Sequence, residues 1–203
     1  MSKLYIRLIL RKLYPHTLVW FLKGSIPPYP PSMKRRLLSN FGISGGLWVE
    51  TGTYLGETTK YLSRKKYNVV TIEPSPSLYK FNERRFKNDP NVCVLYGTSQ
   101  DKLVTAISSA NSNFNFWLDG HYSGGVTHNG GDAPILIELE QIYRHVLPGR
   151  SFMIFVDDFR LTKQGNQGDS TYPARDELMR WILSKGLMWN VEKDILQIWR
   201  SKS

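Results

Sequence analysis

The chain has 203 residues, a length typical of one domain and too short for two full ones. Hydrophobic residues at 41% and aromatic residues at 13% exclude a disordered chain, and 16 Gly with 11 Pro exclude a collagen-like or low-complexity composition. The single cysteine, Cys93, excludes an internal disulfide framework and a cysteine-cluster zinc site. We therefore expect a reducing, cytoplasmic location.

The net charge of +10 is distributed unevenly along the chain. Residues 1–49 carry eight Lys/Arg and no Asp/Glu, for +8, whereas residues 50–203 carry nineteen against seventeen, for +2. We therefore divide the chain into a basic arm with its connector, residues 1–44, and a domain over residues 45–203. The arm's charge would suit a phosphate, an anionic lipid or an acidic substrate.

The arm begins with a basic, aromatic, amphipathic segment. Its longest uncharged stretch, residues 13–22, is half of the roughly 20 residues that a membrane-spanning helix needs, and no cleavage signal follows it. A peripheral membrane contact is one interpretation, but packing of a helix on the domain is favoured because most amphipathic helices do that. Residues 25–32, rich in proline, predict a stiff extended connector.

From residue 47 onward, short apolar runs alternate with helix-length segments. The runs predict five buried strands, at residues 47–50, 69–73, 92–96, 114–119 and 152–157. Helical patterning covers residues 55–66, 76–88, 99–110 and 133–147, the last behind a candidate N-cap, Asp132. A loop at 159–172, a helix at 174–185 and a hairpin of strands near 188–192 and 195–200 follow. The pattern predicts an α/β, doubly wound, mostly parallel seven-stranded sheet, preceded by an N-terminal helical arm.

Open α/β sheets bind ligands beyond the carboxyl ends of their strands, and four of the five runs end there in a carboxylate. The first run ends at Glu50, and Gly52 follows where the chain must turn sharply toward a ligand. Gly56 would let the next helix pack closely. Glu73 ends the second run about twenty residues after the glycine turn, a spacing at which an acid accepts hydrogen bonds from a ribose. An unligated strand-helix turn and a solvated strand end are the simpler alternatives.

This combination suits a dinucleotide or S-adenosylmethionine (SAM). Tyr54 and Glu57 occupy the second and third positions of a Gly-x-Gly-x-x-Gly fingerprint, which argues against NAD.

Three motifs resemble those of a known family: Glu50-Thr-Gly-Thr-Tyr-Leu-Gly, Thr71-Ile-Glu-Pro and Gly97-Thr-Ser-Gln-Asp. They look like the first three cofactor-contacting motifs of class I SAM-dependent methyltransferases, with the closest likeness to metal-dependent O-methyltransferases of the catechol and macrocin types. The resemblance covers residues 45–160 and implies a Rossmann-like sheet with an antiparallel last strand. It implies that the cofactor-binding residues are Glu50, Gly52, Tyr54, Gly56, Glu73, Ser99, Gln100 and Asp119.

In this resemblance, Glu50 and Gly52 lie near the methionine end, Glu73 holds the ribose, and Ser99 with Gln100 borders the adenine. The expected acceptor is a hydroxyl of a small molecule or glycan. Nucleic acid is an unlikely acceptor, because no Asn/Asp-Pro-Pro-Tyr/Phe signature follows the fourth strand and the positive charge is not spread over residues 50–203.

Asp119, Asp157 and Asp158 follow the fourth and fifth strands and are expected to converge. Three neighbouring carboxylates repel one another unless they are protonated or neutralised by a cation, and oxygen ligands suit Mg²⁺ or another hard divalent ion. In the resembling family these positions hold the metal, which orients the acceptor hydroxyl and lowers its pKa. The alternative is that Asp157 and Asp158 form a turn or cap without any metal.

The segment after Asp119 departs from the catechol pattern, since Tyr122 stands where that pattern has a lysine. His121 and Tyr122 are both candidates for the general base, and His121 has the better unperturbed pKa; the alternative for His121 is a neutral wall of the pocket. Residues 123–131, with four glycines and His128, predict a lid over the substrate. A second hypothesis for the whole chain is a non-catalytic cofactor-binding scaffold that docks at a membrane or partner through its arm.

Overall fold

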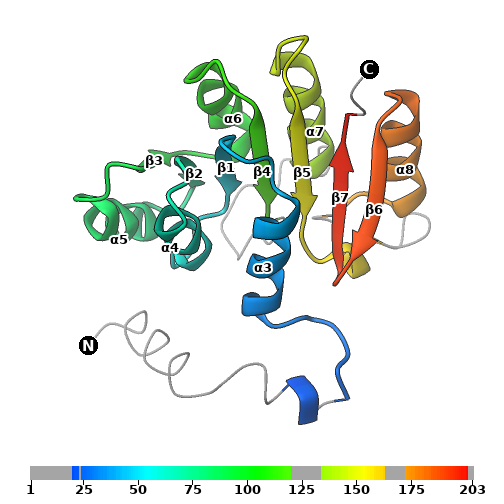
Figure 1. Ribbon diagram of the computed structural model, residues 1–203, viewed down its shortest axis with the longest axis horizontal. Coiled ribbons are helices and arrows are strands. Elements are labelled where there is room, and N and C mark those ends of the chain that lie inside the picture. The colour runs from blue at the N-terminus through cyan, green and yellow to red at the C-terminus, as the bar shows by residue number, and fades with distance from the viewer. Residues whose placement is uncertain (1–19, 23, 120–133, 163–171, 201–203) are drawn as a thin grey trace.

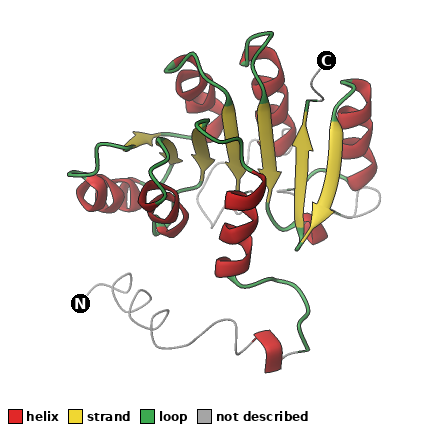
Figure 2. Cartoon of the chain, in the orientation of Figure 1, coloured by secondary structure: helices red, strands yellow, loops and turns green. Residues whose placement is uncertain are grey.

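The computed structural model describes residues 20–22, 24–119, 134–162 and 172–200. The described part forms one seven-stranded sheet between two layers of helices (Figure 1; Figure 2). The strands are β1 (Leu47–Thr51), β2 (Val69–Glu73), β3 (Val92–Tyr96), β4 (Phe114–Leu118), β5 (Phe152–Val156), β6 (Met188–Glu192) and β7 (Ile195–Trp199). Their order across the sheet is β3-β2-β1-β4-β5-β7-β6.

The pairing confirms the predicted fold class. The first five strands are parallel to one another, and β7 is antiparallel to both β5 and β6. The hairpin between β6 and β7 turns on Lys193 and Asp194, which both have positive φ (52° and 64°), as a two-residue turn between twisted strands requires. One prediction for the strands was wrong: residues 92–96 are not fully buried, since β3 is an edge strand with Cys93 and Tyr96 exposed.

Six helices and a short 3₁₀ turn, η1 (Phe159–Leu161), accompany the sheet in the described residues. Figure 1 shows one layer with α3 (Pro31–Phe41), α4 (Glu57–Arg64) and α5 (Pro76–Phe86), and the other with α6 (Ser99–Ser108), α7 (Pro134–His145) and α8 (Arg175–Ser184). The larger core lies under the second layer, where alternate residues of the strands, such as Val49, Phe116 and Ile154, pack on Leu103 and Leu139.

The smaller core lies under α3. Leu37 and Leu38 pack there with Trp48, whose ring stacks on that of Phe155 at 5.7 Å between centroids. Residues 31–41 lie within the region 1–44 that was predicted as a helical arm with its connector, but a helix with these bounds was not predicted. Pro31, at the first helical position, is favourable because a helix leaves that N–H unbonded. The described end of the predicted arm is therefore packed on the sheet.

The amphipathic segment at residues 1–19 lies outside the described residues, so its membrane and packing interpretations both stay predictions. Among the helices that the structure describes, none is long and apolar enough to cross a bilayer.

Candidate active site

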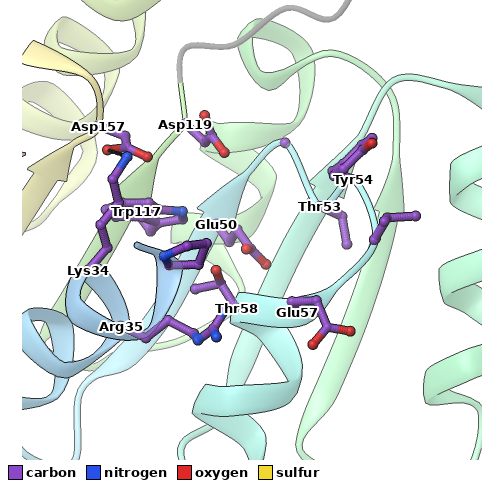
Figure 3. Close-up of a pocket in the computed structure, with 13 residues that line it drawn as sticks. Lys34, Arg35, Glu50, Thr53, Tyr54, Glu57, Thr58, Trp117, Asp119 and Asp157 are labelled. Atoms are coloured by element: carbon purple, nitrogen blue, oxygen red, sulfur yellow. Dashed lines mark hydrogen bonds and ion pairs between the residues drawn. The ribbon is translucent and has the colours of Figure 1, made fainter. Parts of the chain in front are cut away.

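A pocket of about 150 Å³ opens at the carboxyl ends of β1, β4 and β5, under the first turn of α3 (Figure 3). This volume is below the roughly 300–1,000 Å³ of drug-sized sites, so it suits one end of a nucleotide cofactor and a reacting group. The lining residues come from four segments of the chain: Pro31, Lys34, Arg35, Glu50, Gly52, Thr53, Tyr54, Leu55, Glu57, Thr58, Trp117, Asp119 and Asp157.

The turn between β1 and α4 follows a backbone path that requires glycine. Gly52 has φ +84°, and a Cβ there would lie 3.4 Å from the backbone oxygen of Asp119. Gly56, at φ +68°, precedes α4, and a Cβ there would lie 2.5 Å from Asn82 Oδ1 and 2.8 Å from the Phe86 ring. Gly56 was predicted to let the helix pack near the strand. The close contact at Gly56 is present, but it is made with α5.

Glu73 is the last residue of β2, and its side chain contacts the turn between β1 and α4. Its side chain accepts a hydrogen bond from the backbone N–H of Tyr54 at Oε2 (2.8 Å) and from that of Ser75 at Oε1 (2.9 Å). Burial raises the pKa of Glu73, although these two donors favour its charged form. The carboxyl group is thereby fixed at the carboxyl edge of β2, beside the first residues of the glycine turn.

Glu50 is fully buried at the end of β1. Its Oε2 accepts hydrogen bonds from the hydroxyls of Thr59 and Thr71, the latter at 2.9 Å. Burial raises the pKa of Glu50 to about 7, and the charges of Asp119 and Glu73 add to this effect. A cation in the pocket would lower that pKa again, because it favours the carboxylate.

Ser99 and Gln100 begin α6 directly after its N-cap, Thr98, whose hydroxyl accepts the N–H of Asp101. Gln141 of α7 donates to Gln100 O at 2.8 Å and so joins this end to the neighbouring helix. Sequence analysis missed Glu138 of α7, which is 3% exposed and whose charged form is favoured by the side chains of Ser99 and Thr51. Burial raises the pKa of Glu138 to about 7.

The position of Glu138 in the sequence could have predicted its burial. The residue lies three positions after Ile135 and four before Ile142, on the apolar face of its helix, where a glutamate must find partners.

Asp119 follows β4 and lies beside Gly52 at the rim of the pocket (Figure 3). Its backbone N–H donates to Thr51 O at 3.4 Å, which joins the ends of β1 and β4. The charge of Asp119 raises the pKa values of Glu50, Glu138 and Asp157, so the carboxyl edge of the sheet carries an acidic field. Glu50, Gly52 and Asp119, three of the residues expected to bind the cofactor, line the same pocket.

Asp157 and Asp158 do not face an open cation site, because a lysine of α3 contacts them both. Lys34 Nζ donates to Asp157 Oδ1 at 2.6 Å and to Asp158 Oδ1 at 2.9 Å (Figure 3 shows the contact with Asp157). Burial lowers the pKa of Lys34, but the two carboxylates outweigh burial, so the net shift is upward and the ammonium stays charged. Burial raises the pKa of Asp157.

A second cation reaches the same pair. Arg160, in η1, donates to Asp158 Oδ1 at 2.6 Å and also contacts Asp194, at the turn of the β6–β7 hairpin. Burial would raise the pKa of Asp158, yet Lys34 and Arg160 together lower it. Sequence analysis missed both basic residues, since 123 positions separate Lys34 from Asp157 and no local pattern marks the pair.

These contacts do not fit the predicted metal site of Asp119, Asp157 and Asp158. A divalent ion on the Oδ1 atoms of Asp157 and Asp158 would have to displace Lys34 from both, and Arg160 from one, and on the other oxygens it would meet the repulsion of these two cations. Within the described ranges, no group of three His, Cys, Asp or Glu side chains is arranged to hold a metal ion. The candidate base His121, its alternative Tyr122, the lid at 123–131 and Asp132 lie outside the described residues, so the predictions for them are untested.

No protein-family model matches the chain, and no curated protein matches it in sequence. Solved structures match it across almost its whole length. A caffeoyl-CoA O-methyltransferase-like protein from Staphylococcus aureus has 12% identity and a TM-score of 0.60, covering 96% of both chains. A glycopeptide N-methyltransferase in complex with SAM has 14% identity and a TM-score of 0.51, covering 94% of this chain and 98% of that one.

A third match is a methyltransferase-like protein from Streptococcus mutans in complex with S-adenosylhomocysteine (SAH). It has 13% identity and a TM-score of 0.53, and the alignment covers 86% of this chain and 98% of that one. At these identities the comparisons establish the fold, and the chain has the class I methyltransferase fold.

Proposed function

We propose that this protein transfers a methyl group from SAM to a hydroxyl group of a small molecule or glycan. The observation that carries the proposal is the arrangement at one edge of the sheet, where the glycine turn at Gly52, the fixed carboxyl group of Glu73 and the pocket rim at Asp119 meet. In open α/β sheets this edge is where ligands bind.

The residues present fit SAM at its charged and polar ends. Gly52 leaves the backbone open beside Asp119, and Glu50 is a buried acid behind the same turn. Glu73 offers carboxylate oxygens to a ribose diol, and Ser99 with Gln100 begins the helix assigned to the adenine. SAM supplies a methyl group on a positively charged sulfur, and the acidic field of this edge would attract that charge when SAM binds.

Methyl transfer to a hydroxyl requires three things of the protein. It must align the acceptor oxygen with the S–CH₃ bond, exclude water, and take the hydroxyl proton as the new C–O bond forms and the C–S bond breaks. We assign alignment to the pocket wall formed by Asp119, Trp117 and the first turn of α3. His121, two residues after Asp119, remains our candidate for the base.

Metal assistance is not included in this proposal, because Lys34 contacts two of the three aspartates that were predicted as ligands, Asp157 and Asp158. A nucleic-acid acceptor is not included either, because no Asn/Asp-Pro-Pro-Tyr/Phe signature follows the fourth strand and the positive charge is not spread over residues 50–203. A peripheral membrane role for the arm and a cytoplasmic location stay predictions.

Calorimetric titration of the full chain with SAH, followed by a turnover assay that detects SAH released in the presence of pooled phenols, sugars and glycosides, tests the proposal. We expect micromolar SAH binding and acceptor-dependent turnover that is lost in His121→Ala. Binding without turnover would favour the scaffold alternative, and SAH release that depends on RNA would identify a nucleic-acid methyltransferase. Absence of SAH binding would refute the proposal.

A further inference from the structure

Lys34 occupies an unusual position for a lysine, since lysines are almost never buried unless they are paired. It is 9% exposed and lies at the wall of the pocket, on the same face of α3 as Leu37 and Leu38, which are 1% and 0% exposed. The spacing i, i+3, i+4 makes these three side chains neighbours. The two leucines therefore fix α3 on the sheet and, with it, the position of the ammonium group.

Two cationic side chains balance the charge of the carboxylates beside Lys34, as a divalent metal ion would do in a metal site. Three carboxylates meet at this edge, from Asp119, Asp157 and Asp158, and the ammonium of Lys34 and the guanidinium of Arg160 bring two positive charges to the pair at 157 and 158. A divalent cation would bring the same charge. The contact distances of 2.6–2.9 Å are those of charge-assisted hydrogen bonds.

We propose that Lys34 is a built-in cation that takes the place of a divalent metal in the acceptor half of the site. The protein then needs no metal, and removal of the Lys34 ammonium group converts Asp157 and Asp158 into a site for a hard divalent ion. Only the catalytic role of Lys34 rests on the proposed function, because there Lys34 is a positioning residue for the pocket wall that faces the acceptor. The metal preference itself is a property of the side chains.

Mn²⁺ binding to the full-length protein, followed by the electron paramagnetic resonance signal of free Mn²⁺, tests this directly. We expect the wild type to bind no Mn²⁺ up to about 1 mM. We expect Lys34→Met to bind one Mn²⁺ per chain with a Kd of about 0.1 mM, tenfold below that concentration. Its melting temperature should rise when Mn²⁺ is added. The double variant Lys34→Met/Asp157→Asn should lose this binding.

Lys80→Met is the matched control, because Lys80 is exposed on α5, and it should behave as the wild type. A wild type that binds one Mn²⁺, with the binding abolished by Asp157→Asn, would overturn the proposal. A folded Lys34→Met that binds no Mn²⁺ would do the same. If Lys34→Met does not fold, the wild type and Lys34→Arg, which keeps the charge, decide: the proposal predicts that neither binds Mn²⁺.

SAH titration of the wild type with and without EDTA separates this inference from the proposed function. Unchanged SAH affinity in EDTA agrees with both, whereas loss of affinity in EDTA contradicts the built-in cation alone. Absence of SAH binding under both conditions contradicts the proposed function and leaves the Mn²⁺ result to be judged by itself.

Discussion

The two halves of the carboxyl edge hold their acids in different ways. In the cofactor half, formed by β1 to β3, neutral groups of the same region hold Glu50 and Glu73: the hydroxyls of Thr59 and Thr71, and the backbone N–H of Tyr54 and Ser75. In the acceptor half, at the end of β5, the cationic side chains of Lys34 and Arg160 bind Asp157 and Asp158.

This difference has a consequence for function. Neutral donors fix a carboxyl group without cancelling its charge, so the cofactor half keeps an acidic character that suits a sulfonium compound. Lys34 and Arg160 cancel charge, so the acceptor half loses the acidity that would attract a metal ion. We expect the cofactor half to depend on hydrogen-bond geometry and the acceptor half to depend on ion pairs.

The largest expected effect is on folding stability in the acceptor half. Lys34→Met leaves two buried carboxylates without their ammonium partner, and breaking a buried pair in this way costs about 3–5 kcal/mol. Urea denaturation should show this loss, whereas Lys80→Met on the exposed face of α5 should change stability by less than about 0.5 kcal/mol. Equal stability of the two variants would show that the pair contributes nothing and would remove the contrast between the halves.

A pH-dependent effect is expected in the cofactor half. The pKa of Glu50 rises from 4.5 to about 7 on folding, so between these values the folded state binds more protons than the unfolded state. The contribution of Glu50 to stability therefore falls as the pH rises from about 4.5 to 7, by about 3 kcal/mol, and then levels off.

Glu50→Gln removes the ionisable group and should make the protein without cofactor more stable than the wild type at pH 8 but not at pH 4.5. Urea denaturation at both pH values measures this difference. A Glu50→Gln variant that changes stability by the same amount at both pH values would show that folding does not raise the pKa of Glu50.

Cofactor affinity should respond chiefly to Glu73. Glu73→Ala removes the acceptors for the ribose and leaves the N–H groups of Tyr54 and Ser75 without their carboxylate, so SAH should bind about 100-fold more weakly. Calorimetry measures the loss. Glu73→Ala should weaken SAH binding more than Lys34→Met does. A larger loss of SAH affinity in Lys34→Met would indicate that the nucleotide binds in the acceptor half, which would contradict the assignment.

The smallest expected effect is the difference in stability loss between alanine substitutions at two glycines, which reports the close approach of α4 and α5. Gly56 and Gly186 have similar φ values, +68° and +63°, but a Cβ at Gly56 would meet Asn82 and Phe86, whereas a Cβ at Gly186 meets nothing within 4 Å. Each alanine substitution should lower the free energy of unfolding by about 1 kcal/mol, because a Cβ is crowded at positive φ. Gly56→Ala should lose roughly 1–3 kcal/mol more, because of overpacking. Equal losses in thermal denaturation would show that α5 moves aside.

The comparison also explains how far the sequence alone could lead. Glu50 and Glu73 each follow an apolar run, and their partners lie within about twenty positions, so local spacing predicted both the strands and the placement of these acids. The predicted strands agree with the observed ones to within one residue at each end.

The acceptor half could not be predicted in this way. Residues 31–41 carry Lys34, Arg35 and Arg36 and only a short apolar stripe, and their helix is stabilised by Trp48 and by strands more than a hundred positions away. Aspartates at strand ends suggested a metal because the same pattern serves metal ligands and ion-paired carboxylates. Only the position of Lys34 in the fold distinguishes the two.

A crystal structure of the full chain with SAH tests the central claim most directly. The account predicts density for the nucleotide at the carboxyl ends of β1 to β3, with the ribose hydroxyls at about 2.5–3.0 Å from the Glu73 carboxylate and the sulfur beside Asp119 and Gly52. SAH bound elsewhere on the molecule, or a Glu73 carboxylate that has no contact with it, would contradict the account.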